Sequence, residues 1–145
     1  MPKAYASTVV DAPADRVWAA IRDFNGLPGW HSGIADSEIE DGKASDQVGC
    51  IRSFHLKDGA HIRERLLSFS DADRHYSYNF EKTPFDVQNY VATLRVTPVT
   101  DSGRSFVEWW TTFDCDEARE AEMVRTFAGA VFQGGFDALK KHFGG

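Results

Sequence analysis

The sequence is poor in cysteine, in excess positive charge and in long apolar runs. Its two cysteines, Cys50 and Cys115, lie far apart without metal-ligand spacing, which argues against a disulfide framework or a zinc site. A net charge of −6 disfavours binding to nucleic acid or to an anionic membrane. No run approaches the ~20 apolar residues of a membrane span, and the first residues lack a signal-peptide pattern. We therefore expect a cytoplasmic protein with no stable membrane insertion.

Aromatic side chains, in contrast, make up 13% of the chain. Hydrophobic residues at 42% and charged residues at 26% are ordinary for a globular protein. A chain of 145 residues buries roughly 68–70% of its unfolded surface, so it can fold without disulfides or metals. No repeat or linker divides it, and we expect a single domain over residues 1–145, as a monomer or homodimer.

Hydrophobic periodicity predicts an α+β fold. A strand over residues 3–10 is followed by a helix that begins at Asp11-Ala-Pro13, with Asp11 as the N-cap. The glycine-rich stretch 25–33 predicts a loop with room for one helical turn. Residues 117–143 lack proline and repeat apolar side chains at three- and four-residue steps, as in a helix. Turn signals separate six further predicted strands, at 34–41, 48–56, 61–69, 75–81, 87–97 and 105–114.

The turns between consecutive strands are short, which predicts an antiparallel meander. The expected architecture is a curved seven-stranded sheet wrapped around a long C-terminal helix, with short helices between the first two strands. A helix resting on a curved sheet leaves space for a small molecule on the concave side. Because side chains alternate along a strand, parity predicts which residues face that space.

Asp58-Gly59 is the strongest hairpin signal in the chain. A two-residue loop there pairs Ile51 with Leu66, Ser53 with Glu64 and His55 with Ile62, all facing the helix. The other face would be solvated and would carry Cys50, Arg52, Phe54, Arg63, Arg65 and Leu67.

Two residues are candidate acid–base catalysts. Glu64 would have a raised pKa in an apolar pocket, where it could orient a ligand or transfer a proton. Alternatively, a neighbouring Arg or Tyr holds it, or it faces water. His31 lies in the glycine-rich loop, either at the pocket mouth or simply solvated. Its neighbour Trp30 either covers the pocket or anchors the loop. The histidines show no metal-ligand spacing, and we expect no metal.

Parity also places several aromatic side chains of the later strands on the helix-facing side. They form either plain core or the wall of a cavity suited to a flat apolar ligand with scattered oxygens. Three glycines in the last helix, Gly129, Gly134 and Gly135, would permit close approach to the sheet or a kink. The expected ligand-binding residues are Trp30, His31, Ile51, Ser53, Glu64, Leu66, Tyr76, Tyr78, Tyr90, Trp109, Phe127, Val131 and Phe132.

Recognisable segments follow one another along the whole chain: Val10-Asp-Ala-Pro13, Gly29-Trp30-His31, Ile62-Arg-Glu-Arg-Leu-Leu67, Tyr76-Ser-Tyr78, Val107-Glu-Trp109 and Phe132-Gln-Gly-Gly135. In this order they resemble the START-like, or Bet v 1-like (SRPBCC), helix-grip superfamily, in its polyketide cyclase/dehydrase-like branch. The resemblance implies a cavity for apolar ligands between the sheet and the last helix. A cyclase role would imply an Arg, with a Tyr or His, near substrate carbonyls, and Arg52 is predicted to face solvent.

We therefore expect the protein to bind a small hydrophobic molecule, such as an aromatic, polyketide-like or lipid ligand, without a cofactor. One alternative is a cofactor-free cyclase/dehydrase in which Glu64 or His31 moves a proton beside a carbonyl. A further alternative is a protein-interaction or regulatory module, which an exposed apolar patch would favour.

Overall fold

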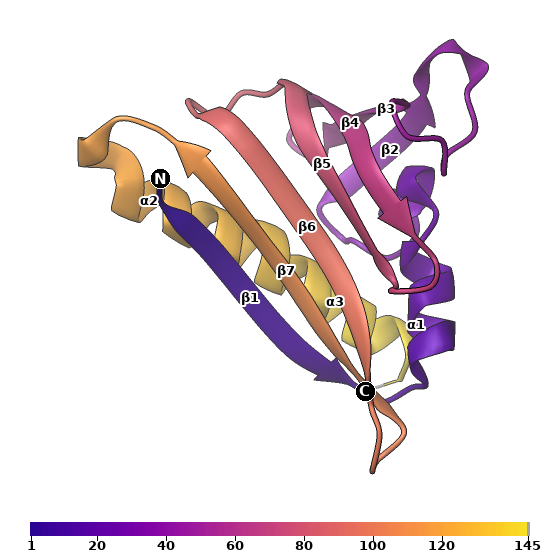
Figure 1. Ribbon diagram of the computed structural model, residues 1–145. Coiled ribbons are helices and arrows are strands. Elements are labelled where there is room, and N and C mark those ends of the chain that lie inside the picture. The colour runs from indigo at the N-terminus through magenta and orange to yellow at the C-terminus, as the bar shows by residue number, and fades with distance from the viewer. Residues whose placement is uncertain (145) are drawn as a thin grey trace.

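The computed structural model describes residues 1–144, and residue 145, the last of the expected domain, lies outside the described residues. Seven strands form one antiparallel sheet in the order β1-β7-β6-β5-β4-β3-β2 (Figure 1). From β2 onward, strands that follow each other in the sequence lie side by side, as the short turns predicted. The strands are β1 (Lys3–Val10), β2 (Ile34–Ile39), β3 (Ile51–Leu56), β4 (His61–Ser70), β5 (His75–Lys82), β6 (Gln88–Val99) and β7 (Arg104–Asp114).

Short helices separate β1 from β2, and a long helical segment follows β7. The former are α1 (Ala14–Ile21) and η1 (Phe24–Gly29), and a single turn, η2 (Glu40–Gly42), follows β2. The C-terminal segment runs along one face of the sheet, behind β1, β7 and β6 in Figure 1. This arrangement confirms the predicted helix-grip fold. Among the described residues, no helix is long and apolar enough to cross a membrane.

The start of α1 differs from the prediction. Pro13 occupies the N-cap position and no side chain caps the helix, so the expected cap at Asp11 is wrong. The fixed φ of proline suits this boundary without a capping hydrogen bond. Asp11 instead lies exposed in the turn after β1.

The C-terminal segment is helical throughout the predicted range but is not one uniform α-helix. It consists of η3 (Glu117–Arg119), α2 (Glu120–Arg125), η4 (Thr126–Gln133) and α3 (Gly134–His142), of which η4 is a π-helix. π-helical turns are rare and occur frequently at functional sites. Gly129 lies within η4, and its low helix propensity fits this departure from α-helical winding.

Gly135 allows the last helix to approach the sheet closely. A Cβ atom at this position would lie 2.7 Å from His31 Cδ2 and 2.9 Å from Trp109 Cζ3, closer than real Cβ contacts. At Gly134 the nearest atom would be 3.8 Å away, and at Gly129 nothing lies within 4 Å. The predicted close approach therefore rests on Gly135 alone among the three helix glycines.

The register of the β3–β4 hairpin corrects the prediction by one residue. Arg52 pairs with Glu64 and Phe54 with Ile62, in place of the expected pairs. The cause is a three-residue loop, because the Leu56 amide donates to the Ala60 carbonyl at 2.9 Å. A slip of one residue turns every side chain of a strand to the other face. Cys50, Arg52 and Phe54 are therefore buried, whereas Ile51, Ser53 and His55 lie on the outer face.

Parity on β4, β5, β6 and β7 agrees with the prediction, and at one end side chains fill the interior. There α1 packs on β6 and β7 and α3 packs on β1, and Trp18 of α1 contacts Tyr76 of β5 at a ring separation of 6.1 Å. We call this region the packed end. It is defined by side chains that are at most 1% exposed: Val17, Ile21, Tyr76, Leu94, Phe136 and Leu139.

Candidate functional site

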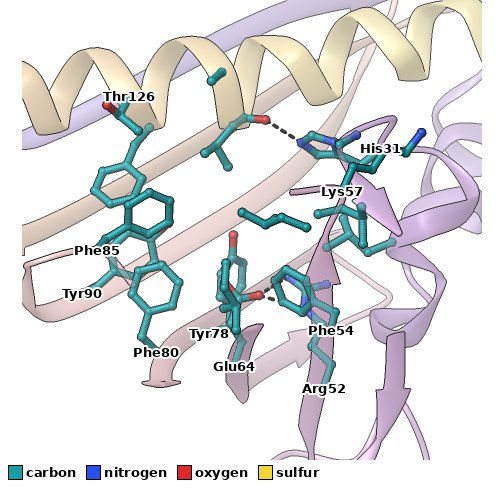
Figure 2. A pocket seen from close by; sticks show the side chains of 18 of the residues that line it. His31, Arg52, Phe54, Lys57, Glu64, Tyr78, Phe80, Phe85, Tyr90 and Thr126 are labelled. Atoms are coloured by element: carbon teal, nitrogen blue, oxygen red, sulfur yellow. Dashed lines mark hydrogen bonds and ion pairs between the residues drawn. The ribbon is translucent and has the colours of Figure 1, made fainter. Parts of the chain in front are cut away.

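At the other end of the interior lies a cavity of about 340 Å³, which we call the pocket. It lies between η4 on one side and the inner face of β3, β4, β5 and β6 on the other (Figure 2). Lys57 and Asp58 of the hairpin loop and Thr126 and Ala130 of η4 belong to its lining. Since Lys57, Asp58 and Ala130 are exposed, the pocket reaches the surface between the hairpin tip and the helix.

One part of the pocket is a cluster of aromatic rings. Phe80 stacks on Tyr90 with ring centroids 3.9 Å apart, and Phe127 lies 5.1 Å from both Tyr90 and Phe85. Phe80, Phe85 and Tyr90 gather below Thr126 in Figure 2. Offset and edge contacts of this kind are favourable between aromatic rings. The same surface can stack on a flat apolar ligand.

A buried ion pair, Arg52 and Glu64, lies at the opposite part of the pocket. Arg52 Nε donates to Glu64 Oε1 at 2.8 Å, and Arg52 Nη2 lies 2.7 Å from the same oxygen. Arg52 Nη1 donates to the Phe24 carbonyl at 3.0 Å. The guanidinium lies 3.9 Å from the ring centroid of Phe24 and 4.8 Å from that of Tyr78. Both charged side chains are thus held in place by several contacts.

The charges of this pair stabilise each other against burial. Burial lowers the pKa of Arg52, but Glu64 together with Tyr76 and Tyr78 more than offsets this, so the pKa lies above its ordinary value. Burial raises the pKa of Glu64, and Arg52 opposes that shift. Contacts of 2.7 and 2.8 Å are typical of a guanidinium–carboxylate pair. The pair contributes no net charge to the pocket.

Two polar atoms beside the pair are available to a ligand. Among the described residues, Glu64 Oε2 has no hydrogen-bond partner, since Arg52 binds only Oε1. The Tyr78 hydroxyl accepts from Trp109 Nε1 at 2.9 Å, which leaves its own proton to donate. Burial raises the pKa of Tyr78 well above its ordinary value and also that of Tyr90, so both hydroxyls stay protonated.

His31 lines the pocket beneath η4, and its hydrogen bonds determine its tautomer. Nδ1 accepts from the Gly33 amide at 3.1 Å, so Nε2 carries the proton that binds the Val131 carbonyl at 2.8 Å. Burial lowers the pKa of His31, which keeps the ring neutral. Both ring nitrogens are thus engaged in positioning the loop against η4. Neither nitrogen is free to exchange a proton with a ligand in this arrangement.

The pocket brings together part of the predicted ligand-binding set. Leu66, Tyr76 and Phe132 are buried but lie outside its lining, as does Trp30, whose ring packs 5.7 Å from that of Trp109. Ile51 and Ser53 lie on the outer face because of the hairpin register. The predicted residues that do line the pocket are His31, Glu64, Tyr78, Tyr90, Trp109, Phe127 and Val131.

Sequence reasoning missed several lining residues. The prediction of a two-residue loop in the β3–β4 hairpin placed Arg52 and Phe54 on the wrong face of the sheet. Phe80 shares the parity of Tyr78 and could have been included on that ground. Phe85 lies in the loop between β5 and β6, where no periodicity predicts a direction. In the described part of the chain, no three His, Cys, Asp or Glu side chains come together as a metal site requires.

Comparisons with known proteins agree with this architecture. The structure of XoxI from Bacillus cereus is similar over 99% of this chain and 96% of that one, with 34% identity and a TM-score of 0.89. An uncharacterised protein from Bacillus thuringiensis shows 32% identity, 99% coverage of both chains and a TM-score of 0.88. A Thermobifida fusca structure has 28% identity, covers 99% of this chain and 94% of that one, and reaches a TM-score of 0.90.

No curated protein matches the sequence. A family described as polyketide cyclase / dehydrase and lipid transport matches residues 1–144, essentially the whole chain. The sheet gripping a C-terminal helix and the pocket between them agree with that match. The chain therefore belongs to the polyketide cyclase/dehydrase and lipid transport family of SRPBCC-type proteins.

Proposed function

We propose that this protein binds a small, largely apolar molecule in the pocket. The observation that carries the proposal is the pocket itself, about 340 Å³ of space that side chains leave unfilled. Binding sites for small molecules are concave and mostly apolar, with a few polar groups that orient the ligand. Phe80, Phe85 and Phe127 supply apolar surface here, and Glu64 and Tyr78 supply polar groups.

The volume limits the size of the ligand. Since a separate water molecule occupies about 30 Å³ in the liquid and bonded atoms occupy less space each, a ligand of at least roughly a dozen non-hydrogen atoms fits. That is the size of two fused aromatic rings with a substituent. Removal of its apolar surface from water, worth roughly 25 cal/mol per Å², would drive binding.

A blocking substitution tests this proposal. Ala130→Trp places a large side chain at the pocket lining, whereas Gln133→Trp adds the same ring at an exposed position of η4 outside the lining. The neutral fluorescent probe N-phenyl-1-naphthylamine should bind the wild type and Gln133→Trp but not Ala130→Trp. Native mass spectrometry of wild-type protein from its own host should detect a co-purified apolar molecule. Absence of both probe binding and a co-purified molecule would contradict the proposal.

A second candidate function is acid–base catalysis in the same pocket, and the unpartnered Glu64 Oε2 next to the Tyr78 hydroxyl favours it. Tyr78 would hold a substrate carbonyl while Glu64 removes a proton from the adjacent carbon. On a substrate recovered by extraction, Glu64→Gln should then lower kcat by about 10²–10⁴ with a small change in affinity. An equal loss of affinity and rate, or an unchanged rate, would exclude Glu64 as the base. His31→Ala should leave proton transfer intact because both ring nitrogens are engaged.

A further inference from the structure

We infer that the pocket selects neutral ligands that carry a hydroxyl group and rejects apolar ligands that carry a carboxylate. The inference rests on the proposed function, and it assigns ligand selectivity to Arg52, Glu64 and Tyr78. A buried arginine in an apolar pocket would ordinarily indicate an acid-binding site, because a guanidinium pairs readily with carboxylates. Here the geometry around Arg52 points to the opposite preference.

All three side-chain nitrogens of Arg52 already contact oxygen atoms of the protein. Two of its nitrogens contact Glu64 Oε1, and the third donates to the Phe24 carbonyl. Its side chain is only 1% exposed and lies against the rings of Phe24 and Tyr78. A ligand carboxylate would have to compete with Glu64 for this one buried cation, and two buried carboxylates cannot both be neutralised by it.

The charges that line the pocket cancel. Glu64 neutralises Arg52 inside the pocket, and Lys57 and Asp58 stand together at its rim. His31 is neutral because burial lowers its pKa. A carboxylate entering the pocket would lose its hydration without a free positive charge to replace it, which is costly. It would also meet the unpartnered oxygen of Glu64 as a like charge.

A hydroxyl group fits the same two atoms without these costs. Glu64 of β4 and Tyr78 of β5 both face inward from adjacent strands. Glu64 pairs with Phe80 and Tyr78 pairs with Leu66, so Glu64 and Tyr78 are diagonal neighbours on the same face of the sheet. Figure 2 shows them next to each other, on the side of the pocket opposite η4. Glu64 Oε2 can accept the proton of a ligand hydroxyl, and the Tyr78 hydroxyl can donate to the oxygen of the same group. The hydroxyl would thus satisfy one acceptor and one donor that the protein leaves open.

Three naphthalene derivatives of matched size test the inference. 2-Naphthol is a neutral donor at pH 7, 2-methoxynaphthalene lacks the donor, and 2-naphthoate is an anion. Titration calorimetry should give about tenfold tighter binding of naphthol than of methoxynaphthalene, as expected when a buried acceptor would otherwise stay unsatisfied. 2-Naphthoate should bind most weakly of the three. Equal or tighter binding of 2-naphthoate by the wild type would overturn the inference.

Substitution of the acceptor should invert this order. Glu64→Gln leaves the charge of Arg52 without a counterion, so affinity for 2-naphthoate should rise about tenfold or more while affinity for 2-naphthol falls. Glu40→Gln is the matched control, because Glu40 pairs with Arg63 at 2.6 Å outside the pocket and its loss should leave all three affinities unchanged. An unchanged order in a folded Glu64→Gln protein would overturn the assignment to Glu64.

The outcomes for the inference and for the proposed function are separable. If Glu64→Gln fails to fold, the wild-type series alone decides the preference for a neutral donor. If none of the three compounds binds and N-phenyl-1-naphthylamine also fails, the proposed function is wrong and the inference falls with it. If the dye binds but 2-naphthoate equals 2-naphthol, the pocket is a binding site without the inferred selectivity. A co-purified ligand that carries a carboxylate would likewise overturn the inference.

Discussion

The packed end and the pocket end of the interior share one sheet but differ in what covers it. At the packed end, α1 and α3 both lie on the sheet, and side chains such as Ile21, Tyr76 and Phe136 are at most 1% exposed. At the pocket end, η4 and the loop that carries Leu27 and His31 face the inner side of β3–β6, and a cavity of about 340 Å³ remains. Two α-helices thus close one end, whereas a π-helix and a loop leave the curved sheet partly unfilled at the other.

The two ends also differ in polarity. The side chains that define the packed end are apolar apart from the Tyr76 hydroxyl, whereas the pocket end holds the Arg52–Glu64 pair, the Tyr78 hydroxyl and His31. Buried charges are weak contributors to stability, because desolvation offsets much of their attraction. The comparison teaches that stability and ligand recognition are located at different ends. Four predictions test this division, from the largest expected effect to the smallest.

Truncation of an aromatic ring should distinguish the two ends most clearly. Phe136→Ala creates a cavity at the packed end and should lower the free energy of unfolding by about 3–5 kcal/mol. Phe85→Ala removes a half-buried ring from the pocket and should cost about 1 kcal/mol while weakening binding of N-phenyl-1-naphthylamine. Urea denaturation measures both losses. Equal losses at the two positions would contradict the division.

Breaking the ion pair should show that the pocket end is sensitive to unpaired charge. Arg52→Met leaves Glu64 buried without a partner and should lower the free energy of unfolding by about 3–5 kcal/mol. The double variant Arg52→Met/Glu64→Met should recover most of this loss because neither charge remains. A double variant as unstable as Arg52→Met would show that the pair stabilises the fold by more than mutual neutralisation. Denaturation at constant pH is the measurement.

Addition of a single methyl group at Gly135 should test how closely the last helix approaches the sheet between the two ends, where Gly135 lies against His31 and Trp109. Gly135→Ala puts a Cβ atom 2.7 Å from His31 Cδ2, so we expect a loss of about 1–3 kcal/mol from overpacking. Gly129→Ala serves as the control, since nothing lies within 4 Å of its Cβ position. It should be neutral or stabilising by up to about 1 kcal/mol through helix propensity. Similar thermal unfolding of the two variants would contradict the close approach.

Acidification should reveal the buried neutral His31 as the smallest of the four effects. Because burial lowers its pKa, the unfolded chain takes up a proton that the folded chain excludes. His31 therefore lowers stability as pH falls below about 6.5, by at most about 1.4 kcal/mol per pH unit. Above that pH its contribution is constant.

The pKa values of His61 and Glu64 are also shifted in the folded protein, so these residues contribute to the pH dependence of stability as well. Comparison of His31→Gln with the wild type at each pH subtracts their contributions and leaves that of His31. The difference in free energy of unfolding between His31→Gln and wild type should change between pH 7 and pH 5, with the wild type losing more on acidification. A difference independent of pH would mean that His31 has the same pKa in the folded and the unfolded chain.

The fold and much of the pocket were predictable from local pattern. Alternation on β5, β6 and β7 correctly placed Tyr78, Tyr90 and Trp109 inside, because a strand between two fixed turns has only two choices of face. The periodicity of residues 117–143 likewise predicted the covering helix. Local pattern failed at the hairpin, where loop lengths of two and three residues suit the same Asp58-Gly59 sequence but reverse the faces of β3.

The sequence by itself determined the alternating strands, their antiparallel order and the helix across them, since these follow from the period of apolar side chains and from turn chemistry. Only the tertiary structure decided that Arg52 meets Glu64, that His31 binds the Val131 carbonyl and that Phe85 reaches the pocket. Arg52 and Glu64 are 12 positions apart in the sequence, and His31 and Val131 are 100 apart. Phe85 contacts Phe127, which lies 42 positions further along the chain. No local period encodes such distances, because they depend on how loops close and how far a helix stands from a curved sheet.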